Sequence, residues 1–136
     1  MAITDHAEIM LYNPTALNDI ESSTNQANDP NNFVAFQGIE YTNVETGHYI
    51  CIFEGEQLLK SPVLDSYFIV KKPNQLWSIL DNFTYETNTR ALALPHHTTK
   101  KSYMQDWTYV NPKYVKLAEV TSVHGECLFE QRHELN

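Results

Sequence analysis

The chain has 136 residues, about the length of one domain, and its 42% hydrophobic and 19% charged residues are ordinary for a globular protein. Its net charge of −8 argues against nucleic acid as a partner, because an acidic surface repels phosphate groups. The sequence contains neither a long apolar run nor the basic start and apolar core of a signal peptide. We therefore expect a single domain over residues 1–136, without a membrane span and with the cytoplasm as its compartment.

The first quarter of the chain predicts short helices and a turn. Residues 7–12 (AEIMLY) are compatible with a helix, which Asn13 and Pro14 would break. Residues 15–27 are compatible with one further short helix. The sequence NDPNN at residues 28–32 is typical of a turn.

The middle of the chain predicts strands followed by a helix. Residues 33–41 and 48–54 are nearly continuous in apolar character, as buried parallel strands are. Residues 65–72 (DSYFIVKK) are compatible with another strand. A helix is predicted from Asn74, which can cap it, to a point before residues 87–89, because apolar residues recur at helical spacing.

Two more strands are predicted in the last third, at residues 90–94 and 116–122. Strands then alternate with helical or irregular connections along the whole chain. This order favours an α/β fold built on a mostly parallel sheet.

Histidine and glutamate residues follow the predicted strands in a regular way. Most of them lie just past the C-terminal end of a strand, where the loops of a parallel α/β fold converge on functional sites. His48 is the exception, because it begins its strand. The residues that follow strand ends are His6, Glu40, His96, His97 and His124.

Imidazole and carboxylate groups that meet at one edge would suit a divalent transition metal. Zn, Mn and Fe accept neutral imidazole, and a glutamate can bridge two ions. Each residue also has a structural alternative: His6 and Glu40 as solvated loop residues, His48 as a strand-end histidine, and His124 as part of a turn before Gly125. The spacing of these residues leaves both interpretations open.

The two cysteines, Cys51 and Cys127, lie 76 residues apart, each in an apolar run. This context predicts buried free thiols rather than a disulfide. A protein with free thiols fits the reducing cytoplasm.

Four stretches of the sequence together resemble the PHP family, named for polymerase and histidinol phosphatase domains. They are ITDHAEI, FVAFQGIEYTN with GHYICIF, ALPHHT, and AEVTSVHG. The resemblance covers about residues 2–126 and is nearest to the metal-dependent phosphoesterase branch. It implies a distorted seven-stranded (β/α)7 barrel with two or three metal ions.

The resemblance also implies roles for individual residues. The implied metal ligands are His6, Glu40, His48, His96 and His97. Of the two adjacent histidines, His96 is favoured as the ligand, with His97 beside it or against the substrate. The attacking group would be a metal-bound hydroxide, supported by Asp5, His97 and His124. Glu119 matches the branch without an assigned role.

The chain departs from the family pattern at both ends. It lacks the HxH motif with which PHP domains begin and the DxH-type motif with which they close. It therefore resembles an internal fragment, whose open sheet edges would allow self-association. His133 does not stand in a DxH context and does not substitute for that motif.

The function that this resemblance implies is hydrolysis of a small-molecule phosphate ester in the complete protein, with weak metal binding and little or no turnover by this chain alone. Two alternatives stay open. The chain could be a non-catalytic protein-interaction or structural module in which the histidines are incidental. It could also be a metal-dependent amide hydrolase, which uses similar ligands.

Overall fold

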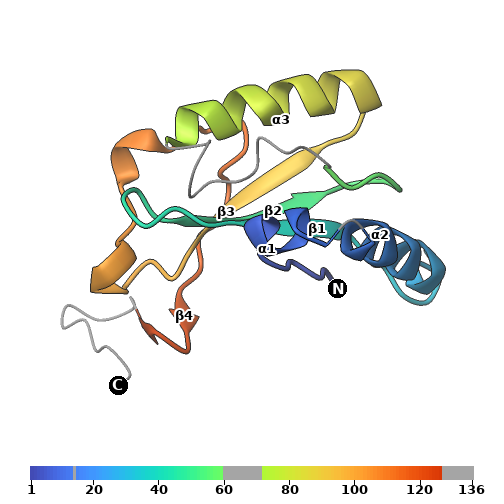
Figure 1. Ribbon diagram of the computed structural model, residues 1–136, viewed down its shortest axis with the longest axis horizontal. Coiled ribbons are helices and arrows are strands. Elements are labelled where there is room, and N and C mark those ends of the chain that lie inside the picture. Colours follow the sequence, from blue (N-terminus) through green and yellow to red (C-terminus); the bar gives the residue numbers. More distant parts are fainter. Residues whose placement is uncertain (14, 60–71, 127–136) are drawn as a thin grey trace.

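A three-stranded sheet forms the centre of the computed structural model, which describes residues 1–13, 15–59 and 72–126 (Figure 1). The strands are adjacent in chain order, and both neighbouring pairs are antiparallel. They are β1 (Gln37–Tyr41), β2 (His48–Phe53) and β3 (Ala91–His96).

The mostly parallel barrel expected from the sequence is therefore wrong. Residues 42–47 connect β1 to β2, and a link this short closes a hairpin, whereas a parallel crossover needs a dozen or more residues. The side chain of Asn43 shapes this loop, because its Oδ1 accepts hydrogen bonds from the backbone N–H groups of Glu45 (3.0 Å) and Thr46 (2.9 Å). Gly47 then completes the turn with a φ of 97°, which favours glycine.

Two irregular segments run along the outer edges of this sheet. The N-terminal residues lie parallel to β1, with isolated bridges from Ala2 to Phe36 and from His6 to Glu40. On the other side, Ala93 N–H donates to the carbonyl of Tyr114 (3.0 Å), and Glu119 N–H donates to the carbonyl of Pro95 (3.1 Å). Both outer edges of the sheet thus make backbone contacts, whereas the sequence predicted open edges.

One face of the sheet packs against α3 (Pro73–Thr87), which crosses above it in Figure 1. The ring of Trp77 meets Tyr49 edge to face at 5.1 Å between centroids, and Phe83 meets Phe53 at the same distance. Alternate strand residues supply the other side of this core, since successive side chains of a strand point to opposite faces. The fully buried members include Ile39, Tyr41, Tyr49, Cys51, Phe53 and Ala93.

The helices fall close to their predicted positions. α1 (Ala7–Leu11) ends before Asn13, and α2 (Ala16–Ala27) fills the segment predicted as a short helix. α3 begins at Pro73 rather than after an Asn74 cap, because proline suits the first helical position. The side-chain oxygen of Gln75 accepts a hydrogen bond from the backbone N–H of Lys72 (3.2 Å), which closes the first turn.

The strand predicted at residues 116–122 is mostly absent. Only its last two residues form β4 (Thr121–Ser122), which pairs with β5 (Gly125–Glu126) in a separate antiparallel hairpin. Before it come two single turns of 3-10 helix, at Lys101–Tyr103 and Trp107–Tyr109. The strand predicted at residues 65–72 lies almost wholly outside the described residues. None of the helices seen in the described ranges has the length and apolar character needed to cross a membrane.

Candidate metal centre

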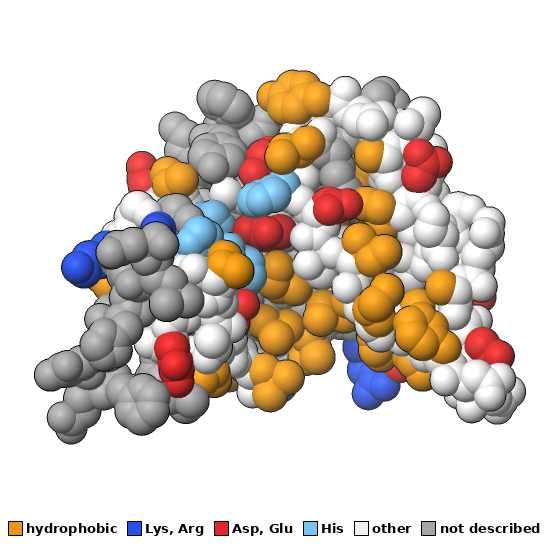
Figure 2. All heavy atoms as spheres, turned by 90° about the horizontal axis from the view of Figure 1, so that it is seen from below, with side chains coloured by type: hydrophobic (Ala, Val, Ile, Leu, Met, Phe, Trp, Pro, Cys, Tyr) orange, Lys and Arg blue, Asp and Glu red, His pale blue; other side chains and the backbone are white. Residues whose placement is uncertain are grey.

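The strand register brings glutamate and histidine side chains together on the face of the sheet that α3 does not cover. His48 pairs with His96 across β2 and β3, while Glu40 pairs with Ile50 and so lies diagonally beside His48. Figure 2 views the molecule from the side away from α3 and shows histidines gathered around an acidic side chain, next to an apolar surface.

Glu40 is the centre of this group, and it is only 6% exposed. Its Oε1 lies 3.0 Å from His48 Nδ1, with which it forms a buried hydrogen bond. Its Oε2 lies 3.8 Å from His6 Nε2 and 4.0 Å from His96 Nε2. Burial by itself would raise the pKa of Glu40, but the hydrogen bond with His48 and the field of His6 and His96 lower that pKa below its ordinary value. The site therefore favours an ionised carboxylate.

The N-terminal segment contributes a second carboxylate next to His6. The parallel bridge to Glu40 fixes the position of His6, and the ring Nδ1 lies 2.9 Å from Thr42 Oγ1 and 3.1 Å from Glu8 Oε1. Glu8 is 9% exposed, and its other oxygen, Oε2, is buried without a hydrogen-bond partner. A buried carboxylate oxygen in this state has lone pairs available for a cation.

A left-handed turn at the end of β3 places both histidines of the HisHis pair on the same side. Adjacent residues of a regular strand point to opposite faces, but His97 has a left-handed φ of 54°. The centroid of its ring lies 3.5 Å from the centroid of the His96 ring. The His124 ring lies 4.4 Å from His97. Burial, with the charges of His96 and His124 in addition, lowers the pKa of His97 to about 4. His97 is therefore neutral at pH 7, which is the form that binds metal.

Three of these residues have the geometry of a metal-binding group. Glu40, His96 and His97 each offer one ligand atom, and the three atoms lie within 4.8 Å of one another. His6 and His48, also predicted as ligands, lie against the same carboxylate. Asp5 is exposed, and its backbone carbonyl accepts a hydrogen bond from Glu40 N–H (2.9 Å).

Sequence reasoning missed two acidic residues of this centre. For Glu8, the available signal was an acidic residue in the first turn of a short helix, two residues after His6. Glu119 was noticed without a role; its Oε2 lies 3.0 Å from His96 Nδ1 and accepts a hydrogen bond from His97 N–H at 2.8 Å. Neither contact follows from spacing, because Glu119 is 22 residues away from His97 in the chain.

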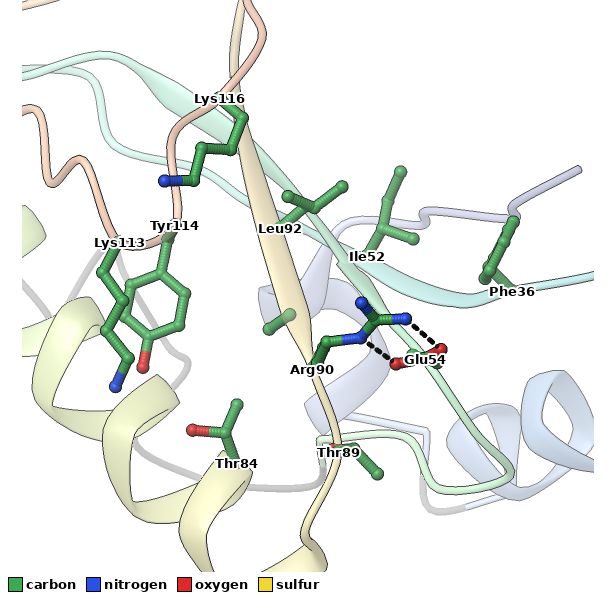
Figure 3. A pocket seen from close by; sticks show the side chains of 11 residues that line it. Phe36, Ile52, Glu54, Thr84, Thr89, Arg90, Leu92, Lys113, Tyr114 and Lys116 are labelled. Carbon is green, nitrogen blue, oxygen red and sulfur yellow. Dashed lines mark hydrogen bonds and ion pairs between the residues drawn. The ribbon is translucent and has the colours of Figure 1, made fainter.

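A separate pocket of about 620 Å³ lies near the opposite end of β3 (Figure 3). Apolar side chains such as Phe36, Ile52 and Leu92 line it. Arg90 and Glu54 also line it, and Arg90 donates two hydrogen bonds to Glu54, at 2.5 and 2.6 Å. A strand of this length spans roughly 17 Å, and none of the pocket-lining residues belongs to the histidine group. The pocket is thus distinct from the candidate metal centre.

Comparison with known families assigns the chain to one protein family. The family model described as "Protein of unknown function (DUF3604)" matches residues 1–116, so the chain belongs to this family. The PHP family does not match, and together with the antiparallel sheet this overturns the resemblance suggested by the sequence motifs. No curated protein matches the chain. Nor does any solved structure.

Proposed function

We propose that this protein binds a divalent transition metal ion at Glu40, His96 and His97 and uses it to hydrolyse phosphate esters. The observation that carries the proposal is the convergence of three ligand atoms within 4.8 Å, from a buried glutamate and two half-buried histidines. Imidazole nitrogen and carboxylate oxygen form a borderline ligand set that suits Zn, Mn or Fe.

The protonation states of the ligands support metal binding. Glu40 has a lowered pKa and supplies negative charge, while His97 is neutral at pH 7 and offers a lone pair. The buried Oε2 atom of Glu8, which has no hydrogen-bond partner, adds negative charge beside His6 that a cation would balance. The residues present therefore fit a divalent ion better than they fit a closed network of hydrogen bonds.

The choice of a phosphate ester rests on two lysines that lie close to the histidine pair in the sequence. The protein is acidic overall, which disfavours anionic substrates, but Lys100 and Lys101 follow the histidine pair in the sequence after two threonines. A backbone hydrogen bond from Lys100 N–H to the carbonyl of His97 (3.0 Å) closes the turn that carries them. A bound metal ion would supply a Lewis acid that polarises the phosphoryl group and activates water.

The test combines metal titration with an activity assay. Isothermal titration with Zn²⁺ and Mn²⁺ should show saturable binding by the parent and at least tenfold weaker binding by Glu40→Gln and His96→Ala. Glu86→Gln, an exposed change on α3, serves as the control and should bind as the parent does. Saturating metal should also raise the melting temperature of the parent, as linkage requires.

Hydrolysis of p-nitrophenyl phosphate and bis(p-nitrophenyl) phosphate should depend on the added metal and be lost in Glu40→Gln. Absence of saturable metal binding would overturn the whole proposal. Binding without turnover would retain the metal site and reject the phosphoesterase function.

A specific observation favours a second candidate function, binding of a protein partner. The surface beside the histidines is apolar (Figure 2). Phe36 and Leu92, which line the pocket near the opposite end of β3, are each 37% exposed. Monomeric proteins rarely leave large apolar patches in contact with water. Sedimentation velocity over a range of concentrations tests self-association on this face. The variant Leu92→Lys should abolish any dimer that forms.

A further inference from the structure

One residue, Glu119, contacts four consecutive positions of the turn that carries the two histidines. Its backbone N–H donates to the carbonyl of Pro95 at 3.1 Å, and its backbone carbonyl accepts a hydrogen bond from Thr98 Oγ1 at 3.2 Å. Its side-chain Oε2 accepts from His97 N–H at 2.8 Å and lies 3.0 Å from His96 Nδ1. Glu119 is thus placed to fix the orientation of this turn.

The contact with His96 has a consequence for the protonation of its ring. A neutral imidazole carries one N–H group, and an ionised carboxylate can only accept. With Glu119 Oε2 at hydrogen-bonding distance, the proton is favoured on Nδ1, which leaves the lone pair on Nε2. Nε2 is the nitrogen that faces Glu40 Oε2, at 4.0 Å.

The contact with His97 supports an unfavourable backbone conformation. Residues other than glycine seldom adopt a positive φ, yet His97 does so, with a φ of 54°. The hydrogen bond from His97 N–H to Glu119 stabilises this conformation, which brings the His97 ring within 3.5 Å of His96. In a regular strand, by contrast, adjacent side chains point to opposite faces of the sheet.

We propose that Glu119 is a positioning residue of the metal centre, which selects the Nδ1–H tautomer of His96 and holds His97 in its left-handed turn. The inference rests on the proposed metal site, and it adds a carboxylate that contacts one of the proposed ligands, His96. Carboxylates that accept from the outer nitrogen of a ligating histidine fix its tautomer and raise its basicity. Loss of such a group typically weakens metal binding by about 10- to 100-fold.

The experiment reads the tautomer directly, in protein freed of metal with EDTA. Two-bond ¹H–¹⁵N correlation spectra of the imidazoles at pH 7.5 should show His96 with its proton on Nδ1. Glu119→Leu should move His96 toward the Nε2–H tautomer. Glu119→Gln keeps an oxygen that can accept from Nδ1–H and should restore the parent tautomer. Glu86→Leu, an exposed change on α3, controls for the loss of a carboxylate elsewhere.

Zinc titration then links the tautomer to binding. Glu119→Leu should bind Zn²⁺ about 10- to 100-fold more weakly than the parent, with Glu119→Gln in between. If the parent binds no zinc, the metal proposal fails, while the spectra still decide whether Glu119 sets the His96 tautomer.

A parent His96 ring that does not carry its single proton on Nδ1 would overturn the positioning role. An unchanged His96 spectrum in Glu119→Leu would overturn it as well. If Glu119→Leu does not fold, two observations decide instead. They are the parent tautomer and the zinc affinity of Glu119→Gln. A parent Nε2–H tautomer rejects the inference, and so does a Glu119→Gln affinity equal to that of the parent.

Discussion

His48, the first residue of β2, lies directly opposite His96, the last residue of β3. Neighbouring antiparallel strands run in opposite directions, so the start of one strand meets the end of the next. This relationship explains why a histidine that begins its strand joins residues that end theirs. The convergence expected of a parallel sheet is thus achieved at one end of an antiparallel sheet, with Glu40 of β1 beside His48.

The first prediction concerns the buried hydrogen bond between His48 and Glu40. Replacing His48 with Leu removes the donor at 3.0 Å and leaves a buried carboxylate oxygen without it. We expect the free energy of unfolding to fall by about 1–3 kcal/mol, the usual cost of such a loss. Urea denaturation in the presence of EDTA measures it. His48→Asn, which keeps an N–H donor near Nδ1, is the matched variant, and equal stability of the two would contradict the prediction.

The second prediction is that acid destabilises the metal-free protein in two steps. His97 has a pKa of about 4 in the folded protein against an ordinary 6.5, so the unfolded chain takes up a proton first as the pH falls. Stability is therefore complete above about pH 6.5 and declines toward pH 4. The lowered pKa of Glu40 acts in the same direction, because its contribution is lost as the pH falls below the ordinary glutamate value.

Melting curves between pH 7.5 and 3.5 test this dependence. His97→Asn removes the imidazole while keeping a residue that tolerates positive φ. Its melting temperature should change less between pH 6.5 and 4 than that of the parent. Parallel curves for the two proteins would show that His97 is not the source of the first step.

The helices were predicted from the sequence, whereas the direction of the strands was not. α3 shows its apolar stripe at helical spacing, because one face packs on the sheet and the other meets water. The strands are apolar on both faces, since Ile50 and Ile52 lie on the uncovered face, and that pattern is typical of parallel sheets. The six residues between β1 and β2 were the better signal, because they are too few for a crossover.

The sequence shows the residue types of the candidate site but not the contacts between them. Histidines and a glutamate near the ends of predicted strands can be identified from the sequence. The roles of Glu8 and Glu119 depend on which segments lie beside the strands, and both segments are irregular. The left-handed turn at His97 cannot be predicted from the sequence either, because the residue with the positive φ is not a glycine.

The third prediction concerns the core beneath α3. Leu80 is fully buried in that core, while Tyr85 on the same helix is 88% exposed. Leu80→Ala should lower the free energy of unfolding by about 2–5 kcal/mol through lost burial and a residual cavity. Tyr85→Ala should change it by no more than about 0.5 kcal/mol. Chemical denaturation of both variants tests whether the packing of α3 on the sheet stabilises the fold, and comparable losses would argue against it.

The fourth prediction is that Cys51 resists alkylation until the protein unfolds. Its side chain is inaccessible to water, and burial raises the pKa of its thiol to about 12. Because the thiolate is the reactive form, a thiol with a raised pKa reacts slowly at pH 8. Iodoacetamide at pH 8 should therefore leave Cys51 unmodified in the native protein and modify it rapidly in urea. Peptide mass spectrometry separates Cys51 from Cys127, which lies outside the described residues, and equal Cys51 labelling in both conditions would place this strand residue outside the core.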